Sequence, residues 1–315
     1  MNDPGITLVY GAGGAQGGAI ARALLREGLR VRTLFRDEHK ANPFRLEGAE
    51  TAIGSYDDFD SLVRASEGAD NVVFQLPLEY DPDKAVRYGA NVVAAAKAAG
   101  VKRFLLNTSS IVPDVPLAAF QVKRRLIETL ADSGIPHLVI KPTVYMENLL
   151  GPWTAPGIVQ NGVFAYPIPA NMPVSWVSLR DVADLVAASI RRGETNGAHI
   201  DLGGPAALTG PDVAALLSER LGKAVAYFPI PHDEFERSLA PAVGADAAKA
   251  IADVYRWQSE QPSSPLVPNR LDAARNLLPA GLTPFARFIA DAPWEAYAPS
   301  GHNDPDAGKE SNAAV

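Results

Sequence analysis

The sequence predicts an α/β protein of the Rossmann type, with a doubly wound parallel sheet, helices on both faces and a smaller C-terminal lobe. Three observations lead to this prediction. Apolar, β-rich runs alternate with helical stretches over the first 150 residues, which is the pattern of repeated βαβ units. Glycines end several helices just before the next strand, and the first strand opens into a glycine-rich loop.

The elements of the first 150 residues follow from these patterns in chain order. Strands are expected in the short apolar runs at Ile6–Tyr10, Val31–Phe35, Glu50–Ile53, Asn71–Leu76, Arg103–Leu106 and His137–Ile140. Helices are expected in the longer stretches rich in Ala, Leu and Arg, at Gly17–Glu27, Phe59–Ala65, Ala85–Ala99 and Leu117–Ser133. Gly28, Gly68, Gly100 and Gly134 are placed as C-terminal caps of these helices.

Beyond residue 150 the pattern loosens and predicts a separate lobe. Helices are expected at Arg180–Arg192, Pro211–Leu221, Asp233–Gln261 and Pro284–Asp291, and strands at His199–Leu202 and Ala224–Phe228. Residues Ala298–Val315 have no periodic apolar positions and predict a disordered tail. We therefore expect a Rossmann domain at 1–150, a lobe at 151–297 with some return to the sheet, and a tail at 298–315.

Composition excludes several classes of function. The net charge of −7 argues against a nucleic-acid-binding surface, which needs clustered Lys and Arg. The absence of cysteine excludes thiol chemistry and cysteine metal sites, and the five histidines have no metal-ligand spacing, so no metal is expected. Because we recognise no secretion signal, we expect a cytoplasmic protein. We expect it to be a monomer or a homodimer.

One uncharged stretch, Asn148–Leu179, is long enough to span a bilayer. Five prolines interrupt it, and a spanning helix could not lose that many backbone donors and remain hydrogen-bonded. The stretch is expected to form loops and a short strand, with no membrane contact.

The glycine-rich loop has the chemistry of a phosphate-binding site. Gly11, Gly14 and Gly17 follow the first strand and lead directly into a helix. Their spacing is G-x-x-G-x-x-G, because Gln16 occupies the position of the last glycine in the commoner G-x-G-x-x-G pattern. Glycines permit the tight turn, and the helix N-terminus supplies positive potential for a pyrophosphate.

The end of the second strand indicates which dinucleotide is bound. NAD-preferring sites place Asp or Glu there to accept from the ribose 2′-hydroxyl, whereas Arg accommodates a 2′-phosphate. Arg36 occupies that position, and Asp37 follows it on the other face of an extended strand. The sequence therefore favours NADP(H) over NAD(H).

These residues, together with others further along, resemble the atypical short-chain dehydrogenase/reductases, and within them the NmrA-like and isoflavone-reductase-like branch. The resemblance covers about residues 5–292. The motifs that carry it are the Gly11–Gly18 loop, Thr33-Leu34-Phe35-Arg36, Gly54-Ser55-Tyr56-Asp57, Asn107-Thr108-Ser109-Ser110, Lys123, Ser133-Gly134-Ile135-Pro136, Lys141–Asn148, Val177–Ala183 and Leu282-Thr283-Pro284-Phe285.

The resemblance implies a set of cofactor-binding positions. Gly11, Ala12, Gly13, Gly14, Ala15, Gln16, Gly17 and Arg36 would bind the phosphates. Tyr56 and Asp57 would lie beside the adenine, and Gln75, Leu76 and Pro77 near the ribose and pyrophosphate. Lys123 would bond the nicotinamide ribose, and Tyr145, Glu147 and Asn148 would flank the nicotinamide.

One departure affects the chemistry. Most short-chain dehydrogenases carry Y-x-x-x-K on one helix face, but the residue four before Lys123 is Ala119, so the tyrosine proton donor is absent. In the isoflavone-reductase-like branch the lysine is assigned the acid/base role, which Lys123 could inherit. Ser109, at the end of the fifth strand, could polarise a substrate carbonyl, and Tyr145 could replace the missing phenol. Lys123, Ser109 and Tyr145 are therefore the candidate catalytic residues.

The uncharged stretch carries Trp153, Phe164, Tyr166 and Trp176, which would suit either a wall of an apolar substrate pocket or a buried loop or subunit contact. We expect an NADP(H)-dependent reductase that transfers hydride to an apolar or aromatic carbonyl, quinone or activated alkene bound by the C-terminal substrate-binding lobe. The alternative is a non-catalytic NADP(H) redox sensor of the NmrA-like kind.

Overall fold

The structure is a computed structural model that describes residues 4–193, 197–269, 271–278 and 280–298. The chain forms two compact units. The first comprises Met1–Pro142, Leu179–Leu202 and Arg270–Gly281, and the second comprises Thr143–Ser178, Gly203–Asn269 and Leu282–Val315. The expected boundary at residue 150 thus lies inside the second unit, and the expected tail lies, apart from Ala298, outside the described residues.

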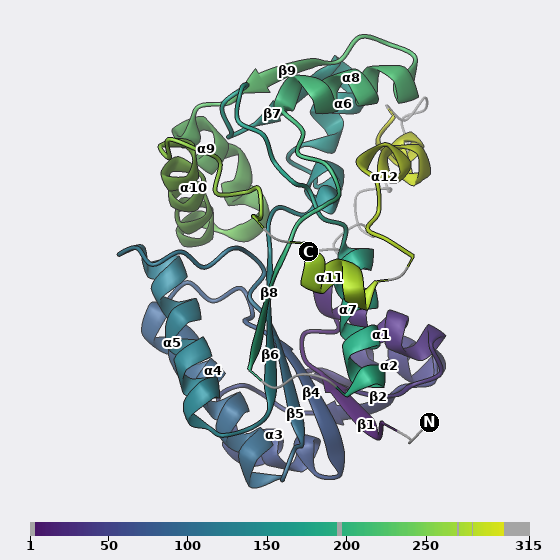
Figure 1. Cartoon of the computed structure of the whole chain (residues 1–315), viewed down its shortest axis with the longest axis vertical. Helices are drawn as coiled ribbons and strands as arrows, with labels where there is room; N and C mark the ends of the chain where they lie inside the picture. Colours follow the sequence, from purple (N-terminus) through teal and green to yellow (C-terminus); the bar gives the residue numbers. More distant parts are fainter. Residues whose placement is uncertain (1–3, 194–196, 270, 279, 299–315) are drawn as a thin grey trace. The chain divides into compact units, whose positions relative to one another are not determined.

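The first unit contains a seven-stranded parallel sheet with the strand order β3-β2-β1-β4-β5-β6-β8 (Figure 1). Its strands are β1 (Ile6–Val9), β2 (Arg30–Phe35), β3 (Glu50–Ile53), β4 (Ala69–Gln75), β5 (Arg103–Asn107), β6 (His137–Pro142) and β8 (Ala198–Leu202). The order reverses direction between β1 and β4, which is the point where doubly wound folds bind their ligands. The Rossmann prediction is confirmed.

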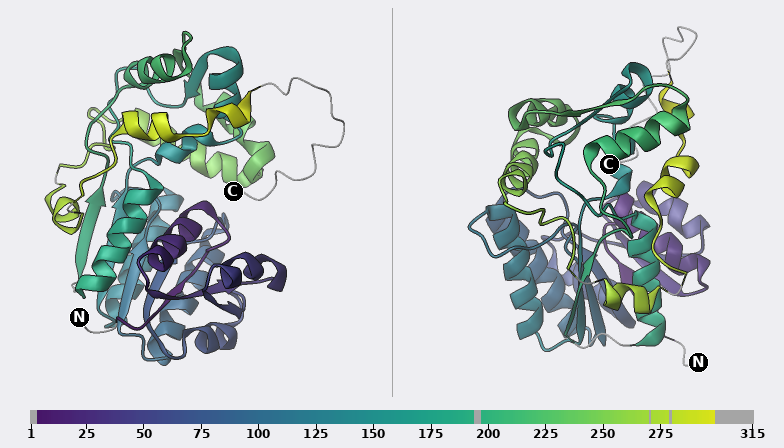
Figure 2. Two further views of the ribbon diagram at one scale, coloured as in Figure 1. Left: turned by 90° about the vertical axis from the view of Figure 1, so that its right-hand side faces the viewer. Right: turned by 45° about the horizontal axis from the view of Figure 1, so that its top comes forward.

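Helices cover both faces of this sheet. On one face lie α1 (Ala15–Arg26), α2 (Glu38–Leu46) and α7 (Leu179–Arg192), and on the other lie α3 (Phe59–Ser66), α4 (Pro82–Ala98) and α5 (Ala118–Asp132) (Figure 2). A short helix, α11 (Asp272–Leu277), packs near β8 and α7. The second face buries a continuous apolar cluster that includes Leu62, Val92, Phe104 and Leu126.

Helix α2 is not predicted from the sequence, and the reason is local. Pro43 interrupts its interior, and only Ala41 and Phe44 bury their side chains, so the segment has little apolar periodicity. Asp37 caps the helix by accepting a hydrogen bond from the His39 backbone N–H at 2.8 Å.

The second unit is built around a short parallel pair, β7 (Val163–Tyr166) and β9 (Ala226–Pro229). Its helices are η1 (Met146–Leu150), α6 (Ala155–Asn161), α8 (Gly210–Leu221), α9 (His232–Val243), α10 (Ala245–Ser259), α12 (Phe285–Asp291) and η2 (Trp294–Tyr297). The mostly helical structure expected over Asp233–Gln261 is confirmed; it consists of two helices, α9 and α10, divided at Gly244, whose φ of 90° breaks the helix.

The aromatic residues of the uncharged stretch form the core of this second unit. Phe164, Tyr166 and Trp176 are 0%, 1% and 3% exposed and pack on one another, and Trp176 also packs on Phe285. Of the two interpretations left open by the sequence, the structure favours buried packing over an open pocket wall for these three residues. Within the described part of the chain, no helix is both long and apolar enough to cross a membrane.

Candidate cofactor site

The loop after β1 has the geometry that its glycines predict. Gly11 adopts a φ of 68°, which lets the chain turn sharply, and the Gly14 N–H donates to the Gly11 carbonyl at 3.0 Å. A Cβ atom on Gly17 would lie 2.4 Å from that same carbonyl oxygen. Helix α1 can approach the loop this closely only because residue 17 has no side chain.

The N-terminus of α1 is suited to bind an anion. No side chain caps the helix, and its first turn contains no acidic residue. Gly13 and Ala15 are exposed. Gly13 has no side chain and Ala15 has only a methyl group, so backbone N–H groups and the helix dipole present positive potential on a surface with little to obstruct a phosphate.

The end of β4 lies against this loop. The Nε2 atom of Gln75 lies 3.3 Å from the position that a Cβ on Gly11 would occupy. Leu76 and Pro77 follow directly and are partly exposed. The structure thus brings together the two predicted segments at the carboxyl ends of β1 and β4, where the strand order reverses.

Arg36 and Asp37 have different surroundings in the structure. Asp37 is engaged as the cap of α2. Arg36 is exposed, and its guanidinium forms no ion pair with the carboxylates of the described residues. It lies close enough to Tyr56 to lower the pKa of that phenol, although burial has the larger effect and raises it. A guanidinium without a carboxylate partner, at this strand end, fits a 2′-phosphate.

Tyr56 and Asp57 are held by helix α4 and by the core. The Tyr56 ring packs against Tyr10 and Tyr88, with ring centroids 6.0 and 5.3 Å apart. The Tyr88 hydroxyl donates to the Asp57 carboxylate at 2.7 Å, and this hydrogen bond lowers the pKa of Asp57. Both residues follow β3, next to the end of the strand that carries Arg36.

Lys123, on α5, forms a close pair with Ser110. Its Nζ atom donates to the Ser110 hydroxyl oxygen at 2.5 Å. The lysine is partly buried, and desolvation lowers its pKa from 10.5 to about 8. A lysine with such a pKa holds a proton at neutral pH and can release it with little difficulty.

Ser109 has a different partner from its neighbour. Its hydroxyl donates to Oε1 of Gln16 at 2.9 Å. The sequence points to Ser109 as the candidate catalytic serine, but the order of residues along the chain does not show which hydroxyl faces the lysine. The structure pairs Lys123 with Ser110.

Three further predicted residues belong to the second unit. Tyr145 is 7% exposed and forms a parallel bridge with Val177, whereas Glu147 and Asn148 lie on η1 and are partly exposed. The Asn148 amide donates to the Tyr166 hydroxyl at 3.1 Å. Their place beside a nicotinamide remains the expectation drawn from the resemblance.

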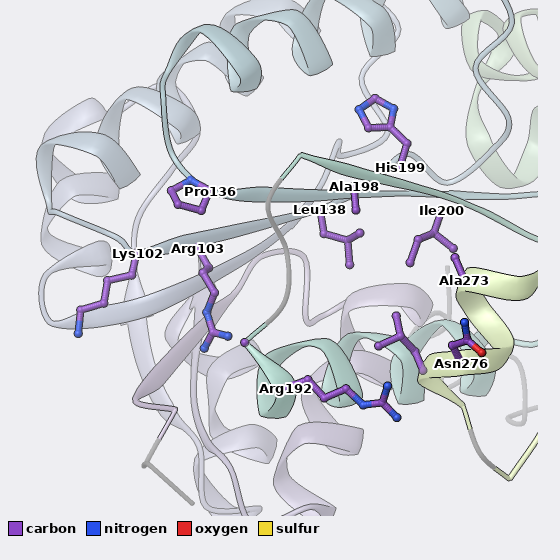
Figure 3. A pocket seen from close by; sticks show the side chains of 12 residues that line it. Lys102, Arg103, Pro136, Leu138, Arg192, Ala198, His199, Ile200, Ala273 and Asn276 are labelled. Atoms are coloured by element: carbon purple, nitrogen blue, oxygen red, sulfur yellow. The ribbon is translucent and has the colours of Figure 1, made fainter.

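A cavity of about 720 Å³ lies elsewhere in the first unit (Figure 3). It adjoins the amino ends of β5, β6 and β8, near Arg103, Pro136 and Ala198, whereas the glycine loop follows the carboxyl end of β1. Arg103 is already bonded to the Asn71 side chain and the Ile190 carbonyl. This cavity is therefore not the dinucleotide site. No group of three or more His, Asp or Glu residues in the described ranges could hold a metal ion.

The strand order, the glycine loop and the uncapped helix define a dinucleotide-binding protein of the Rossmann class. The family model described as the NmrA-like family matches residues 5–289. The chain therefore belongs to the NmrA-like family, and it is an oxidoreductase of the atypical short-chain dehydrogenase/reductase group.

Similar proteins agree with this assignment. The chain is 34% identical over 251 residues to an NAD(P)H azoreductase of Xenophilus azovorans, covering 78% of this chain and 83% of that protein. It is 32% identical over 297 residues to (4-alkanoyl-5-oxo-2,5-dihydrofuran-3-yl)methyl phosphate reductase of Streptomyces griseus, covering 93% and 99%. The fold also matches an NADPH-dependent quinone oxidoreductase from Escherichia coli, solved with NADPH, with a TM-score of 0.77, 24% identity and coverage of 90% and 98%.

Proposed function

We propose that this protein is an NADPH-dependent reductase that transfers hydride to a conjugated, apolar acceptor: a quinone, an apolar or aromatic carbonyl, or an activated alkene. The observation that carries the proposal is the Lys123–Ser110 pair, which lies in the same unit as the glycine loop and Arg36. The relatives named as azoreductase, oxo-dihydrofuran reductase and quinone oxidoreductase support a conjugated acceptor.

The residues of the first unit fit a bound NADPH. Gly11–Gly17 and the N-terminus of α1 would hold the pyrophosphate, and Arg36 the 2′-phosphate. When bound, the reduced nicotinamide supplies the hydride.

Lys123 and Ser110 would transfer the proton to the substrate. Lys123 holds its proton on Nζ, hydrogen-bonded to Ser110 Oγ, and the Ser110 hydroxyl donates to the Ile111 carbonyl at 2.9 Å. Rotation of that hydroxyl toward a substrate oxygen would let the serine donate its proton there while it accepts one from Lys123. Quinones and enones suit this arrangement, since their reduced oxyanions are weak bases and do not require the missing tyrosine.

The experiment is NADPH oxidation against a panel of quinones and enones. We expect acceptor-dependent turnover, and a loss of about 10²–10⁴-fold in Lys123→Met, the usual effect of removing a general acid. If Lys123 only positions the cofactor, Lys123→Arg will keep most of the turnover. NADPH binding without turnover on any acceptor would contradict the reductase and favour the redox-sensor alternative.

Cofactor preference is tested by Arg36→Asp. Losing a charge-assisted phosphate contact costs on the order of 1.5–3 kcal/mol, and a carboxylate adds repulsion, so NADPH affinity should fall at least tenfold. NADH affinity should change little. The matched control is Arg237→Asp, the same charge change at an exposed residue of α9. Equal weakening of both dinucleotides in a fluorescence titration would show that Arg36 does not contact the 2′-phosphate.

A further inference from the structure

Two side chains from the end of β5 converge on one atom of the phosphate-binding helix. Oε1 of Gln16 accepts from Asn107 Nδ2 at 2.9 Å and from Ser109 Oγ at 2.9 Å. The Asn107 Oδ1 atom in turn accepts from the Ser109 backbone N–H at 3.0 Å. Because that N–H can only donate, it fixes Oδ1 as the acceptor and Nδ2 as the donor, so the orientation of both amides is determined.

The loop that these bonds hold is in an unusual conformation. Ser109 has a φ of 59° and is the only non-glycine residue with a positive φ among those the structure describes. A left-handed serine is uncommon and persists where its surroundings enforce it. Here the Ser109 backbone N–H, the Ser109 hydroxyl and the nearly inaccessible Asn107 (1% exposed) supply that enforcement.

Because Ser109 is left-handed, the hydroxyls of Ser109 and Ser110 contact different partners. Ser109 Oγ reaches Gln16 on α1, whereas Ser110 Oγ accepts from Lys123 on α5. Thr108 also contacts Ser110, because its hydroxyl donates to the Ser110 carbonyl at 2.6 Å. Ser110 thus follows directly after the residue that Gln16 holds, and its carbonyl contacts a threonine that is also bonded to the Ile140 carbonyl at 3.1 Å.

We propose that Gln16 is a positioning residue: its carboxamide fixes the Asn107–Ser110 loop and thereby aligns the Ser110–Lys123 pair with the phosphate-binding helix. This inference rests on the proposed reductase function and adds to it a contact between the cofactor loop and the proton-handling pair. Glutamine suits the position because it accepts two hydrogen bonds without a charge. A glutamate would accept the same bonds but would place a negative charge at the N-terminus of α1, where a phosphate is to bind.

The test compares Gln16→Met and Ser109→Gly with wild type. Methionine keeps the length of glutamine but its thioether accepts hydrogen bonds only weakly, and glycine removes the hydroxyl while tolerating the left-handed backbone. The matched control is Gln121→Met, the same change on α5 at a partly buried residue outside this hydrogen-bonded chain. The readouts are the NADPH Kd, kcat with a quinone, and the Lys123 titration followed by NMR of 15N-labelled lysine.

We expect Gln16→Met and Ser109→Gly to lower kcat about 10- to 100-fold, the effect of a small misplacement of reacting groups. The Lys123 pKa should rise from about 8 toward 10.5, because a loosened loop admits water. Gln16→Glu keeps the two hydrogen bonds but should weaken NADPH binding, and the control should match wild type.

Two results would overturn the inference: an unchanged Lys123 titration in both variants, or an equal change in the Gln121→Met control. The titration does not require turnover. A wild-type protein that oxidises no NADPH therefore counts against the reductase proposal, whereas the titration decides the role of Gln16.

Discussion

Lys123 is the residue on which the chemical argument depends most. Its side chain is partly withdrawn from water, yet in the described structure its ammonium group has a neutral hydroxyl as its hydrogen-bond partner rather than a carboxylate. Burial of this kind disfavours the charged form, which is why its pKa falls to about 8. A lowered lysine pKa is useful for proton transfer near neutral pH but opposes folding whenever the group is charged.

This destabilisation by the charged lysine leads to a prediction about the stability of a Lys123 variant. The unfolded chain holds the proton up to a pKa of about 10.5 and the folded chain only to about 8, so the ionised lysine destabilises the fold below pH 8. Lys123→Met should therefore raise the free energy of unfolding at pH 7 by on the order of 1–3 kcal/mol. The gain should fade as the pH rises from about 8 to 10.5. Urea unfolding at pH 7 and pH 10 measures both values, and a variant less stable than wild type at pH 7 would contradict the pKa assignment.

At the scale of single elements, α1 depends on the packing of its first turn against the loop before it. Gly17 and Gly18 are buried there, and a Cβ on Gly17 would lie 2.4 Å from the Gly11 carbonyl oxygen and 2.7 Å from that of Tyr10. Neither backbone oxygen can move away easily, because both belong to the turn that ends β1.

Gly17→Ala should therefore displace the helix start. The overpacking should cost about 1–3 kcal/mol and abolish tight NADPH binding. Gly14→Ala is the matched control, since its Cβ would meet only the Gly11 oxygen, at an ordinary 3.5 Å. Thermal unfolding distinguishes them, and a Gly17→Ala protein that melts at the same temperature as Gly14→Ala would refute the packing argument.

Some helices, strands and site contacts could be predicted from the sequence, and others could not. Strong apolar runs located the strands of the sheet, and glycine spacing located the tight turn between β1 and α1, since both signals are local. Helix α2 was missed because only two of its residues are buried. The choice of Ser110 over Ser109 as the lysine's partner depends on one left-handed backbone angle, which no composition or periodicity encodes.

At the scale of the whole molecule, the Rossmann unit is assembled from three separate segments. Helix α7 packs on α1, and β8 pairs with β6, although both follow the first segment by many residues. A chain cut at the expected domain boundary would leave the β6 edge unpaired and one face of α1 uncovered.

A protein truncated after residue 150 should consequently fail to fold cooperatively. Scanning calorimetry should show a single or double transition for the full chain and none for the fragment. A fragment with its own sharp transition and NADPH affinity would show that α7 and β8 are dispensable.

The most direct test of the account is single-turnover hydride transfer. The protein is loaded with NADPH, mixed rapidly with a quinone, and followed by NADPH fluorescence. We predict a rapid, acceptor-dependent loss of the bound NADPH signal that slows in Lys123→Met, with NADH-loaded protein reacting only at much higher dinucleotide concentration. Two results would contradict the proposed function: tight NADPH binding with no acceptor-dependent loss of the NADPH signal, or a loss of that signal that is equally fast in Lys123→Met.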